Sequence, residues 1–216
     1  RQQNPDGGWG WWPRAGDSRS SPYITGYVVF GLVKARQAGF DVKPQVLSNG
    51  VAYLSNELMN VSEFRNYRDA NRQAWLVYVL TEADAPSRDA IDTLFENREK
   101  LSYYARGYLA QAIWLINAAD ARLATLLSDL NNAAILSATG AHWEESHRDW
   151  WAMNTDTRST AIILDTLAKL DPENELIPNV VRWLMVARQA GIWETTQETA
   201  WALIALTDWM VETGEL

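Results

Sequence analysis

The chain has 216 residues, 47% of them hydrophobic, which is enough for one domain with a large core and no covalent staples. Its formal net charge of −8 and the lack of a basic stripe argue against nucleic acid as a partner. The absence of cysteine excludes a disulfide, a thiolate metal site and a cysteine nucleophile within these residues, and no apolar run approaches the roughly 20 residues of a membrane helix. We therefore expect a single domain over residues 1–216 with no membrane span.

The chain opens with a segment that is rich in glycine, proline and tryptophan. Residues 4–13 read NPDGGWGWWP, a run that favours tight turns over helix. A helix is predicted to follow, with Ser21 as its N-cap, Pro22 at its first position and Gly39 at its end. The chain also starts without an initiator methionine or a signal peptide, so we expect it to be a fragment of a longer polypeptide.

A pattern of residue sizes repeats five times along the chain. A small residue is followed at once by a large one, and a large aliphatic residue stands six positions after the small one. The five pairs of small and large residues are Gly26-Tyr27, Ala74-Trp75, Gly107-Tyr108, Ala161-Ile162 and Ala200-Trp201. Since the residues between are mostly apolar too, each repeat is predicted to be an inner helix that is buried on nearly all sides.

Helices that bury most of their circumference need a second, more polar layer outside them. The gaps between the repeats have room for it, and we expect outer helices within residues 44–59, 87–97, 121–136 and 176–190. Inner helices that alternate with outer ones predict an all-α fold, the α/α toroid. The count is about nine helices where a closed ring of six hairpins needs about twelve, so we expect an incomplete ring, with the missing helices before Arg1 and after Leu216.

Three tryptophans stand in connections that contain glycine and precede inner helices. Trp9 follows Gly8, Trp143 follows residues 140–142, and Trp193 follows Gly191. We expect them to be packing residues that fold under the end of the barrel.

The two histidines, His142 and His147, fall in the segment HWEESH and superficially resemble a zinc-binding helix. Such a helix needs two histidines four residues apart so that both imidazoles share a face. A spacing of five turns them away from each other, and no third ligand stands out. We therefore predict no metal site and no cofactor.

Carboxylates near the ends of inner helices leave an enzymatic alternative open. Some α/α toroids are glycoside hydrolases, which use a pair of carboxylates beside tryptophans that stack on sugars. The candidate carboxylates are Asp6, Asp69, Glu144, Glu145, Asp149 and Asp156. Terpene cyclases and protein prenyltransferases fit less well, because the former want several acidic residues where residues 154–157 have only Asp156, and the latter bind zinc through a cysteine that this chain lacks.

Several motifs stand in a fixed order along the chain. The turn DGGWG at residues 6–10 is followed by YIT at 23–25 and KARQAG at 34–39. Residues 141–144 read AHWE, and VRWL at 181–184 is followed by IWETTQET at 192–199. In this order the motifs resemble the thioester domains of the α2-macroglobulin and complement family, and the expanded tryptophan run and the KARQAG helix end are more similar to its bacterial members. The resemblance runs almost from end to end.

The resemblance implies part of a large protein that traps proteases, in which a thioester between a cysteine and a glutamine captures the attacking protease. No reactive residue can be assigned here, because cysteine is absent and Gln2, Gln3, Gln37 and Gln197 lie in the wrong contexts. Either the thioester motif lies on a helix before Arg1, or the protein belongs to the members that lack a thioester. Residues 60–70 also contain no histidine that could assist acyl transfer in the manner of complement proteins.

The leading hypothesis is therefore a domain without enzymatic activity, from a bacterial macroglobulin in the periplasm or outside the cell. Its partners would be the other domains of the same polypeptide and, through the parent protein, target proteases. Trp11, Trp12 and Tyr23 are candidates to line an apolar pocket around the acyl site. The same three side chains would fit a structural role in the core equally well.

Overall fold

The computed structural model describes residues 2–12, 19–147 and 149–214. Within these ranges it contains nine α-helices and one short two-stranded hairpin, which confirms the all-α class and the helix count. The chain forms two compact units, Arg1–Asn97 and Arg98–Leu216, which are described in turn.

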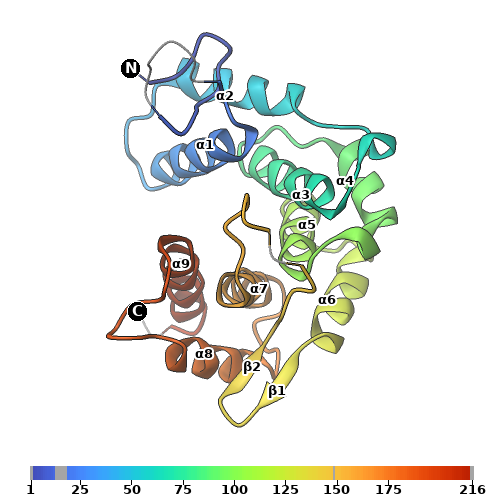
Figure 1. Cartoon of the computed structure of the whole chain (residues 1–216), viewed down its shortest axis with the longest axis vertical. Coiled ribbons are helices and arrows are strands. Elements are labelled where there is room, and N and C mark those ends of the chain that lie inside the picture. The colour runs from blue at the N-terminus through green and yellow to red at the C-terminus, as the bar shows by residue number, and fades with distance from the viewer. Residues whose placement is uncertain (1, 13–18, 148, 215–216) are drawn as a thin grey trace. The chain divides into compact units, whose positions relative to one another are not determined.

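The first unit contains four α-helices in two layers (Figure 1). They are α1 (Pro22–Gln37), α2 (Pro44–Asn56), α3 (Tyr67–Glu82) and α4 (Arg88–Glu96). A single 3₁₀ turn, Val61–Glu63, leads into α3. Helix α1 packs against both α2 and α3, and α4 packs against α3.

The second unit contains five α-helices and the hairpin. They are α5 (Tyr103–Ile116), α6 (Arg122–Asn132), β1 (Ile135–Ser137), β2 (Gly140–His142), α7 (Asp156–Leu170), α8 (Ile177–Val186) and α9 (Thr196–Glu212). Helix α7 lies between α5 and α9, while α6 packs on α5, and α8 packs on α7 and β2 (Figure 1).

Four of the five inner helices begin at a polar residue whose side chain accepts a backbone hydrogen bond. Ser21 caps α1 by accepting from the Ile24 amide, as the sequence predicts, and Pro22 follows it. Asn66, Thr155 and Thr195 cap α3, α7 and α9 in the same way. These caps satisfy amide groups that a helix leaves without intrahelical partners at its start.

Burial separates the inner helices from the outer ones. Helices α3, α5 and α7 are buried around almost their whole circumference, whereas α2, α4, α6 and α8 bury only one face, which confirms the alternation predicted from the sequence. For α1 and α9 the prediction of burial on nearly all sides is wrong. In the second unit α7 has an inner helix on either side, but α9 packs mainly on α7 and leaves Leu203 and Val211 more than half exposed.

In two of the helices, steric contact with a neighbouring helix explains why the first residue of the repeat must be small. A Cβ atom on Gly26 would collide with the Trp75 indole nitrogen of α3. A Cβ atom on Gly107 would lie 2.8 Å from Thr166 Oγ1 of α7, which is tighter than van der Waals contact. The small side chain therefore lets neighbouring inner helices approach closely, and the large residue after it fills the adjacent space.

Three outer helices end earlier than predicted. Helix α2 ends at Asn56 rather than near residue 59, and α8 ends at Val186 rather than 190. Helix α6 ends at Asn132 because the chain turns into the hairpin, in which Ile135 pairs with His142 and Ser137 with Gly140. Gly140 has a φ of 132°, and a Cβ atom there would collide with the Asn179 carbonyl of α8, so only glycine lets the hairpin pack against that helix.

Candidate functional site

The connections that lead into the N-termini of the inner helices hold most of the unusual side chains. In three of them a tryptophan is fixed to a threonine that directly precedes the small residue of the repeat. The Trp9 amide donates to Thr25 Oγ1 at 2.8 Å, the Trp143 amide donates to Thr160 Oγ1 at 3.1 Å, and the Thr199 hydroxyl donates to the Trp193 carbonyl at 3.5 Å. In these three repeats, therefore, the threonine before the small residue positions the preceding turn.

The indole rings of two of these turn tryptophans also satisfy the ends of outer helices. Trp143 Nε1 donates to the Leu130 carbonyl of α6 at 2.8 Å, and Trp193 Nε1 donates to the Leu184 carbonyl of α8 at 3.0 Å. Trp143 is 0% exposed and Trp193 is 4% exposed. The predicted packing role is confirmed for both, while Trp9 is half-buried against Gly50 of α2.

Two of the three connections carry an insertion between the turn tryptophan and the N-cap of the inner helix. Residues 10–20 separate Trp9 from Ser21, and residues 144–154 separate Trp143 from Thr155, whereas Trp193 is followed by the Thr195 cap almost at once. Each insertion contains two adjacent tryptophans at the protein surface. Trp11 and Trp12 are 54% and 79% exposed, and Trp150 and Trp151 are both 76% exposed.

The structure places the three residues predicted to line a pocket in different environments. Trp11 and Trp12 are too exposed to belong to the core, so the structural alternative is wrong for them. Tyr23 is half-buried at the start of α1, where its ring packs edge-on against Tyr27. A cavity of about 460 Å³ in the first unit lies elsewhere, between residues 58–64 and α4. A pocket lined by these three side chains remains a prediction.

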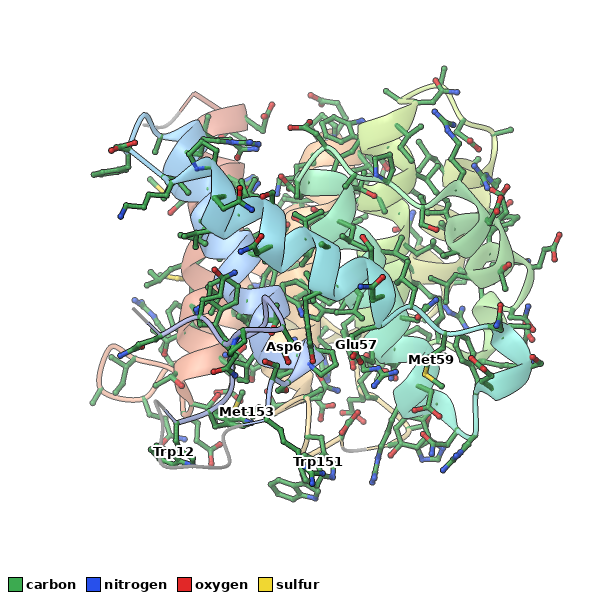
Figure 2. The ribbon with its side chains drawn as sticks, turned by 90° about the horizontal axis from the view of Figure 1, so that it is seen from above. Asp6, Trp12, Glu57, Met59, Trp151 and Met153 are labelled. Atoms are coloured by element: carbon green, nitrogen blue, oxygen red, sulfur yellow. The ribbon has the colours of Figure 1, made fainter. Side chains whose placement is uncertain are left out.

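Trp150 and Trp151 project from a short turn, residues 149–154, which is held by its own hydrogen bonds. The carboxylate of Asp149, itself 4% exposed, accepts from the Trp151 and Ala152 amides at 3.0 and 3.3 Å. The Asn154 amide donates to the Asp149 carbonyl at 3.0 Å and closes the turn. Figure 2 shows the Trp151 side chain pointing away from the ribbon. We refer to residues 149–154 as the tryptophan turn.

Beneath the tryptophan turn lies a buried arginine from the first turns of α7. Arg158 is 1% exposed and donates to Asn154 Oδ1 and to the Tyr108 hydroxyl, both at 3.2 Å. Its guanidinium also lies 5.0 Å from the centre of the Tyr104 ring, within the range of a cation–π contact. Ser159 donates a further hydrogen bond to Asn154 Oδ1 at 3.1 Å. The end of the tryptophan turn is thereby anchored to both α5 and α7.

Glu145 ties the start of the same insertion to the N-terminus of α5. Its carboxylate accepts from the Tyr103 and Tyr104 amides at 3.1 and 3.0 Å, while its own amide donates to Asp156 at 3.1 Å. Ser102, the N-cap of α5, makes no side-chain capping bond. The Glu145 carboxylate, more than 40 residues away along the chain, accepts the hydrogen bonds of the first α5 amides instead. Burial raises the pKa of Glu145 above its ordinary value, and the amide bonds oppose that rise.

The six carboxylates proposed for a glycoside hydrolase all have local partners. Five of them accept from backbone amides: Asp6 from Gly8, Asp69 from Arg65, Glu145 from Tyr103 and Tyr104, Asp149 from Trp151 and Ala152, and Asp156 from Glu145. The sixth, Glu144, lies 3.1 Å from His142 Nε2. Capping and turn formation account for these carboxylates, and the geometry does not favour the enzymatic alternative.

The histidines likewise do not form a metal centre in the part of the chain that the structure describes, where no group of three potential ligands comes together. His142 lies on β2 and stacks on the Trp183 ring of α8, with the ring centres 4.6 Å apart and the planes almost parallel. This contact holds the hairpin on α8. None of the described helices combines the length and the apolar character that crossing a membrane requires.

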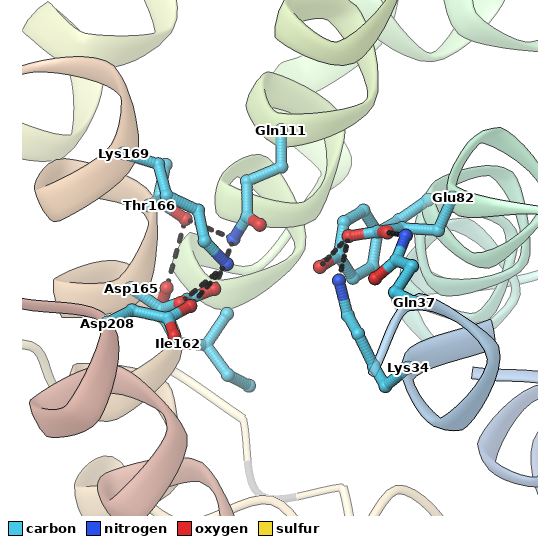
Figure 3. A network of polar contacts seen from close by, with 10 residues as sticks. Lys34, Gln37, Glu82, Gln111, Ile162, Asp165, Thr166, Lys169 and Asp208 are labelled. Atoms are coloured by element: carbon cyan, nitrogen blue, oxygen red, sulfur yellow. Dashed lines mark hydrogen bonds and ion pairs between the residues drawn. The ribbon is translucent and has the colours of Figure 1, made fainter. Parts of the chain in front are cut away.

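A second polar cluster lies in the second unit, among the facing sides of α5, α7 and α9. Lys169 Nζ lies 2.7 Å from the fully buried Asp165 and 2.9 Å from Asp208 (Figure 3). Burial alone would lower the pKa of Lys169, but the charges of the two aspartates raise it, so the amine stays charged. Gln111 donates to Asp165 and Thr166 at 3.0 Å, so the cluster serves to join three helices.

The first unit has a simpler ion pair of the same kind. Lys34 of α1 lies 2.8 Å from Glu82 of α3, and the Tyr78 hydroxyl donates to the same carboxylate at 3.0 Å (Figure 3). Lys34 is partly exposed, whereas Glu82 is buried. Each unit therefore joins its inner helices through a lysine and a buried carboxylate.

Comparison with known proteins agrees with the motifs and the fold. A scan against profiles of known protein families finds no match. In sequence, the chain is 28% identical over 210 residues to the "Alpha-2-macroglobulin" of Thermotoga maritima and 26% identical over 234 residues to the "Alpha-2-macroglobulin homolog" of a Nostoc strain. These alignments cover 97% and 99% of the chain. The chain resembles bacterial α2-macroglobulins. It spans only 11% of the length of either relative.

The fold is shared with solved macroglobulins. Salmonella α2-macroglobulin reacted with methylamine matches 96% of the chain with a TM-score of 0.77 at 19% identity, and the match covers 13% of that protein. The native Escherichia coli protein, in a structure that spans domain MG7 to the C-terminus, matches 97% of the chain with a TM-score of 0.69 at 19% identity, and the match covers 32% of that structure. The helical array therefore occurs as one part of much longer macroglobulin chains.

Sequence reasoning found the turn tryptophans and the exposed pair of the first insertion, but it missed Trp150, Trp151 and Arg158. A signal for the second pair was present, because two adjacent tryptophans stand between a turn tryptophan and a threonine of the repeat in both insertions. No pattern in the sequence indicated Arg158, because its burial depends on Asn154, Tyr104 and Tyr108, which surround it only in the folded structure.

Proposed function

We propose that this chain is the thioester-type domain of a bacterial α2-macroglobulin that traps proteases, and that it acts without catalysing a reaction itself. The observation that supports this most is the similarity in sequence and fold to bacterial macroglobulins over nearly the whole chain. The local roles of the six candidate carboxylates support it further, because they leave the rival glycoside hydrolase without an assigned acid and base.

The contribution of this domain would be to hold an acyl site, reactive or vestigial, and to release it when neighbouring domains move. No cysteine is present in the chain, so the thioester cysteine would have to come from elsewhere in the parent polypeptide. In this proposal Trp11, Trp12 and Tyr23 line the apolar surroundings of that site. The parent would act in the periplasm or outside the cell, where it meets foreign proteases.

Protease trapping is tested on the longer polypeptide that contains this chain. The polypeptide is mixed in excess with trypsin, and cleavage is followed with a small peptide substrate and with a large protein substrate. We expect the small substrate to be cleaved almost normally and the large one at least about tenfold more slowly, because an enclosed protease excludes large molecules only. The matched control is the same polypeptide without residues 1–216, which should lose the effect. Equal cleavage of the large substrate with and without the intact polypeptide contradicts the proposal.

The thioester is tested separately. Incubation of the longer polypeptide with labelled methylamine should attach one amine per chain, and heating should cleave the backbone at the same glutamine. If both signals are absent while trapping persists, the protein belongs to the macroglobulins that lack a thioester. If methylamine is incorporated, the surroundings of the site can be mapped by repeating the reaction with Trp11→Ala, Trp12→Ala and Tyr23→Ala variants.

A further inference from the structure

The tryptophan turn exposes two large apolar side chains to solvent. This exposure costs free energy that packing inside this chain would avoid. Trp150 and Trp151 are both 76% exposed, although an indole buries about 150–250 Å² when it is packed. Exposed apolar surface of this kind on a folded protein commonly marks a site of interaction. The two rings therefore mark a candidate interaction site.

The turn is built to hold its tryptophans in place. The buried Asp149 carboxylate fixes the Trp151 amide, the Met153 amide donates to the Trp150 carbonyl at 3.2 Å, and Asn154 is bonded to the buried Arg158. Met153 has a φ of 49°, a backbone conformation that costs a residue other than glycine roughly 1 kcal/mol or more. A solvated loop has no need of such constraints, whereas a preorganised turn loses little conformational entropy when a partner binds.

The same feature occurs at the equivalent place in the first unit. There the insertion after Trp9 carries Trp11 and Trp12, again adjacent and again exposed, before the N-cap of an inner helix. The third connection, after Trp193, has no insertion and no exposed pair of tryptophans. Exposed tryptophan pairs thus belong to the insertions and not to the repeat, which indicates a role beyond packing the repeat.

We propose that the tryptophan turn docks onto a folded neighbouring domain of the same polypeptide, which receives the Trp150 and Trp151 side chains in an apolar pocket. This inference rests on the proposed function, since the macroglobulin relatives are about nine times as long as the segment they share with this chain. Tryptophan is enriched among the residues that dominate binding energy at protein interfaces, where it fills such pockets.

Other occupants agree less well with the structure. Binding to an anionic membrane surface is strengthened by clusters of basic residues beside the aromatic ones, whereas Arg148 is the one lysine or arginine within five residues of Trp150 and Trp151 along the chain, which carries a net charge of −8. A sugar site needs polar side chains available to bond hydroxyl groups beside the indoles, but the carboxylates of Asp149 and Asp156, which bracket the turn in sequence, accept from backbone amides. A neighbouring domain requires neither feature.

Hydroxyl-radical footprinting tests the proposal directly. Trypsin cleaves after Arg148 and after Arg158 and so releases residues 149–158 as one peptide. Fragmentation of this peptide separates oxidation of Trp150 and Trp151 from that of Met153. We expect the oxidation rate of both tryptophans to be at least about fivefold lower in the longer polypeptide than in the isolated chain, since a docked residue is desolvated. Trp143, which is 0% exposed in this chain, is the internal reference and should not change.

A variant separates docking from stability. In the longer polypeptide, docking should slow hydrogen exchange at residues 149–158 beyond the rate set by the turn's own hydrogen bonds, and W150A/W151A should return it to the rate of the isolated chain. The variant should also increase the rate of limited proteolysis between domains, while the thermal midpoint of the isolated variant chain stays unchanged. The matched control is L203A/V211A, which alters two exposed apolar residues of α9. Equal effects of the two double variants overturn the proposal.

Three further results would also overturn it: equal oxidation of the tryptophans in the isolated chain and the longer polypeptide, protection that depends on the concentration of the isolated chain and therefore comes from a second copy, or protection only on added lipid vesicles. The outcome is distinguishable from failure of the proposed function. Protease trapping with exposed tryptophans refutes the docking surface alone, and protected tryptophans without trapping refute the function alone.

Discussion

Trp143 and Trp151 stand only eight residues apart in the connection between β2 and α7, yet they occupy opposite environments. The Trp143 ring is wholly buried, and its indole nitrogen donates to the last turn of α6. The Trp151 ring is 76% exposed and projects from the tryptophan turn (Figure 2). Both are tryptophans of the same connection, so residue type does not distinguish them. What distinguishes them is whether another element of the fold reaches the same place.

The difference shows how this chain divides its tryptophans between two tasks. Trp143 and Trp193 are buried, and each donates an indole hydrogen bond to the end of the outer helix that precedes it. Trp150 and Trp151 are held by a turn whose hydrogen bonds involve only their backbone. Stability should therefore depend on the first group and binding on the second, and the five predictions below test that division.

The largest effect is expected for Trp143→Ala. It removes a fully buried indole and leaves the Leu130 carbonyl without its donor, so the free energy of unfolding should fall by about 3–5 kcal/mol. Urea denaturation followed by circular dichroism measures this. Trp143→Phe keeps much of the volume but not the donor and should fall between the wild type and the alanine variant. A loss below about 1 kcal/mol would contradict the packing role.

Glu145, two residues after Trp143, should give the next largest effect. Glu145→Ala leaves the Tyr103 and Tyr104 amides at the start of α5 without their acceptor, and we expect a loss of about 2–4 kcal/mol. Glu145→Gln retains one acceptor oxygen and should cost less. The same urea series measures both variants.

The pH dependence of Glu145 has a definite sign. Because its pKa is raised in the folded state above the ordinary value of 4.5, the folded state binds the proton more tightly than the unfolded state does. Its contribution to stability is therefore greatest below that ordinary value and declines as pH rises through the interval up to the raised pKa. Relative to Glu145→Gln, the wild type should lose stability as the pH rises above the ordinary value of 4.5. A wild type that instead gains stability over this interval would show that the amide bonds outweigh burial.

A smaller effect is expected at the contact between α1 and α3. Gly26→Ala forces a methyl group against the Trp75 indole, and we expect it to destabilise the protein by about 1–3 kcal/mol. The matched control is Gly31→Ala in the same helix, where a Cβ atom meets nothing within 4 Å and the better helix propensity should stabilise by about 0.5–1 kcal/mol. Thermal denaturation of the two variants compares them. Shifts in the same direction would contradict the close approach of these helices.

The smallest effect on stability is expected at Trp150 and Trp151. Each alanine substitution should change the free energy of unfolding of the isolated chain by no more than about 0.5 kcal/mol, because the side chains have few contacts to lose. Chemical denaturation of the single variants measures it. A loss comparable with that of Trp143→Ala would mean that the turn belongs to the core, and the division between the two tasks would fail.

Much of the helical layout could be predicted from the sequence. The Ser21 cap, the alternation of inner and outer helices and the burial of Trp143 and Trp193 follow from size, polarity and turn residues that lie close together along the chain. The hairpin that shortens α6 could not be predicted, since it depends on the contact of Gly140 and His142 with α8, about 40 residues later. The half-exposed faces of α1 and α9 also depend on which neighbours each helix has.

Local sequence dictates where helices start, which of their faces are apolar and which residues must be small, because capping, amphipathic periodicity and steric size act over a few neighbouring residues. Long-range packing dictates which tryptophans are covered, which carboxylate caps α5 and that Arg158 is enclosed. Each of these depends on groups that are far apart in the chain and meet only after folding, as Glu145 meets the first turn of α5 across more than 40 residues.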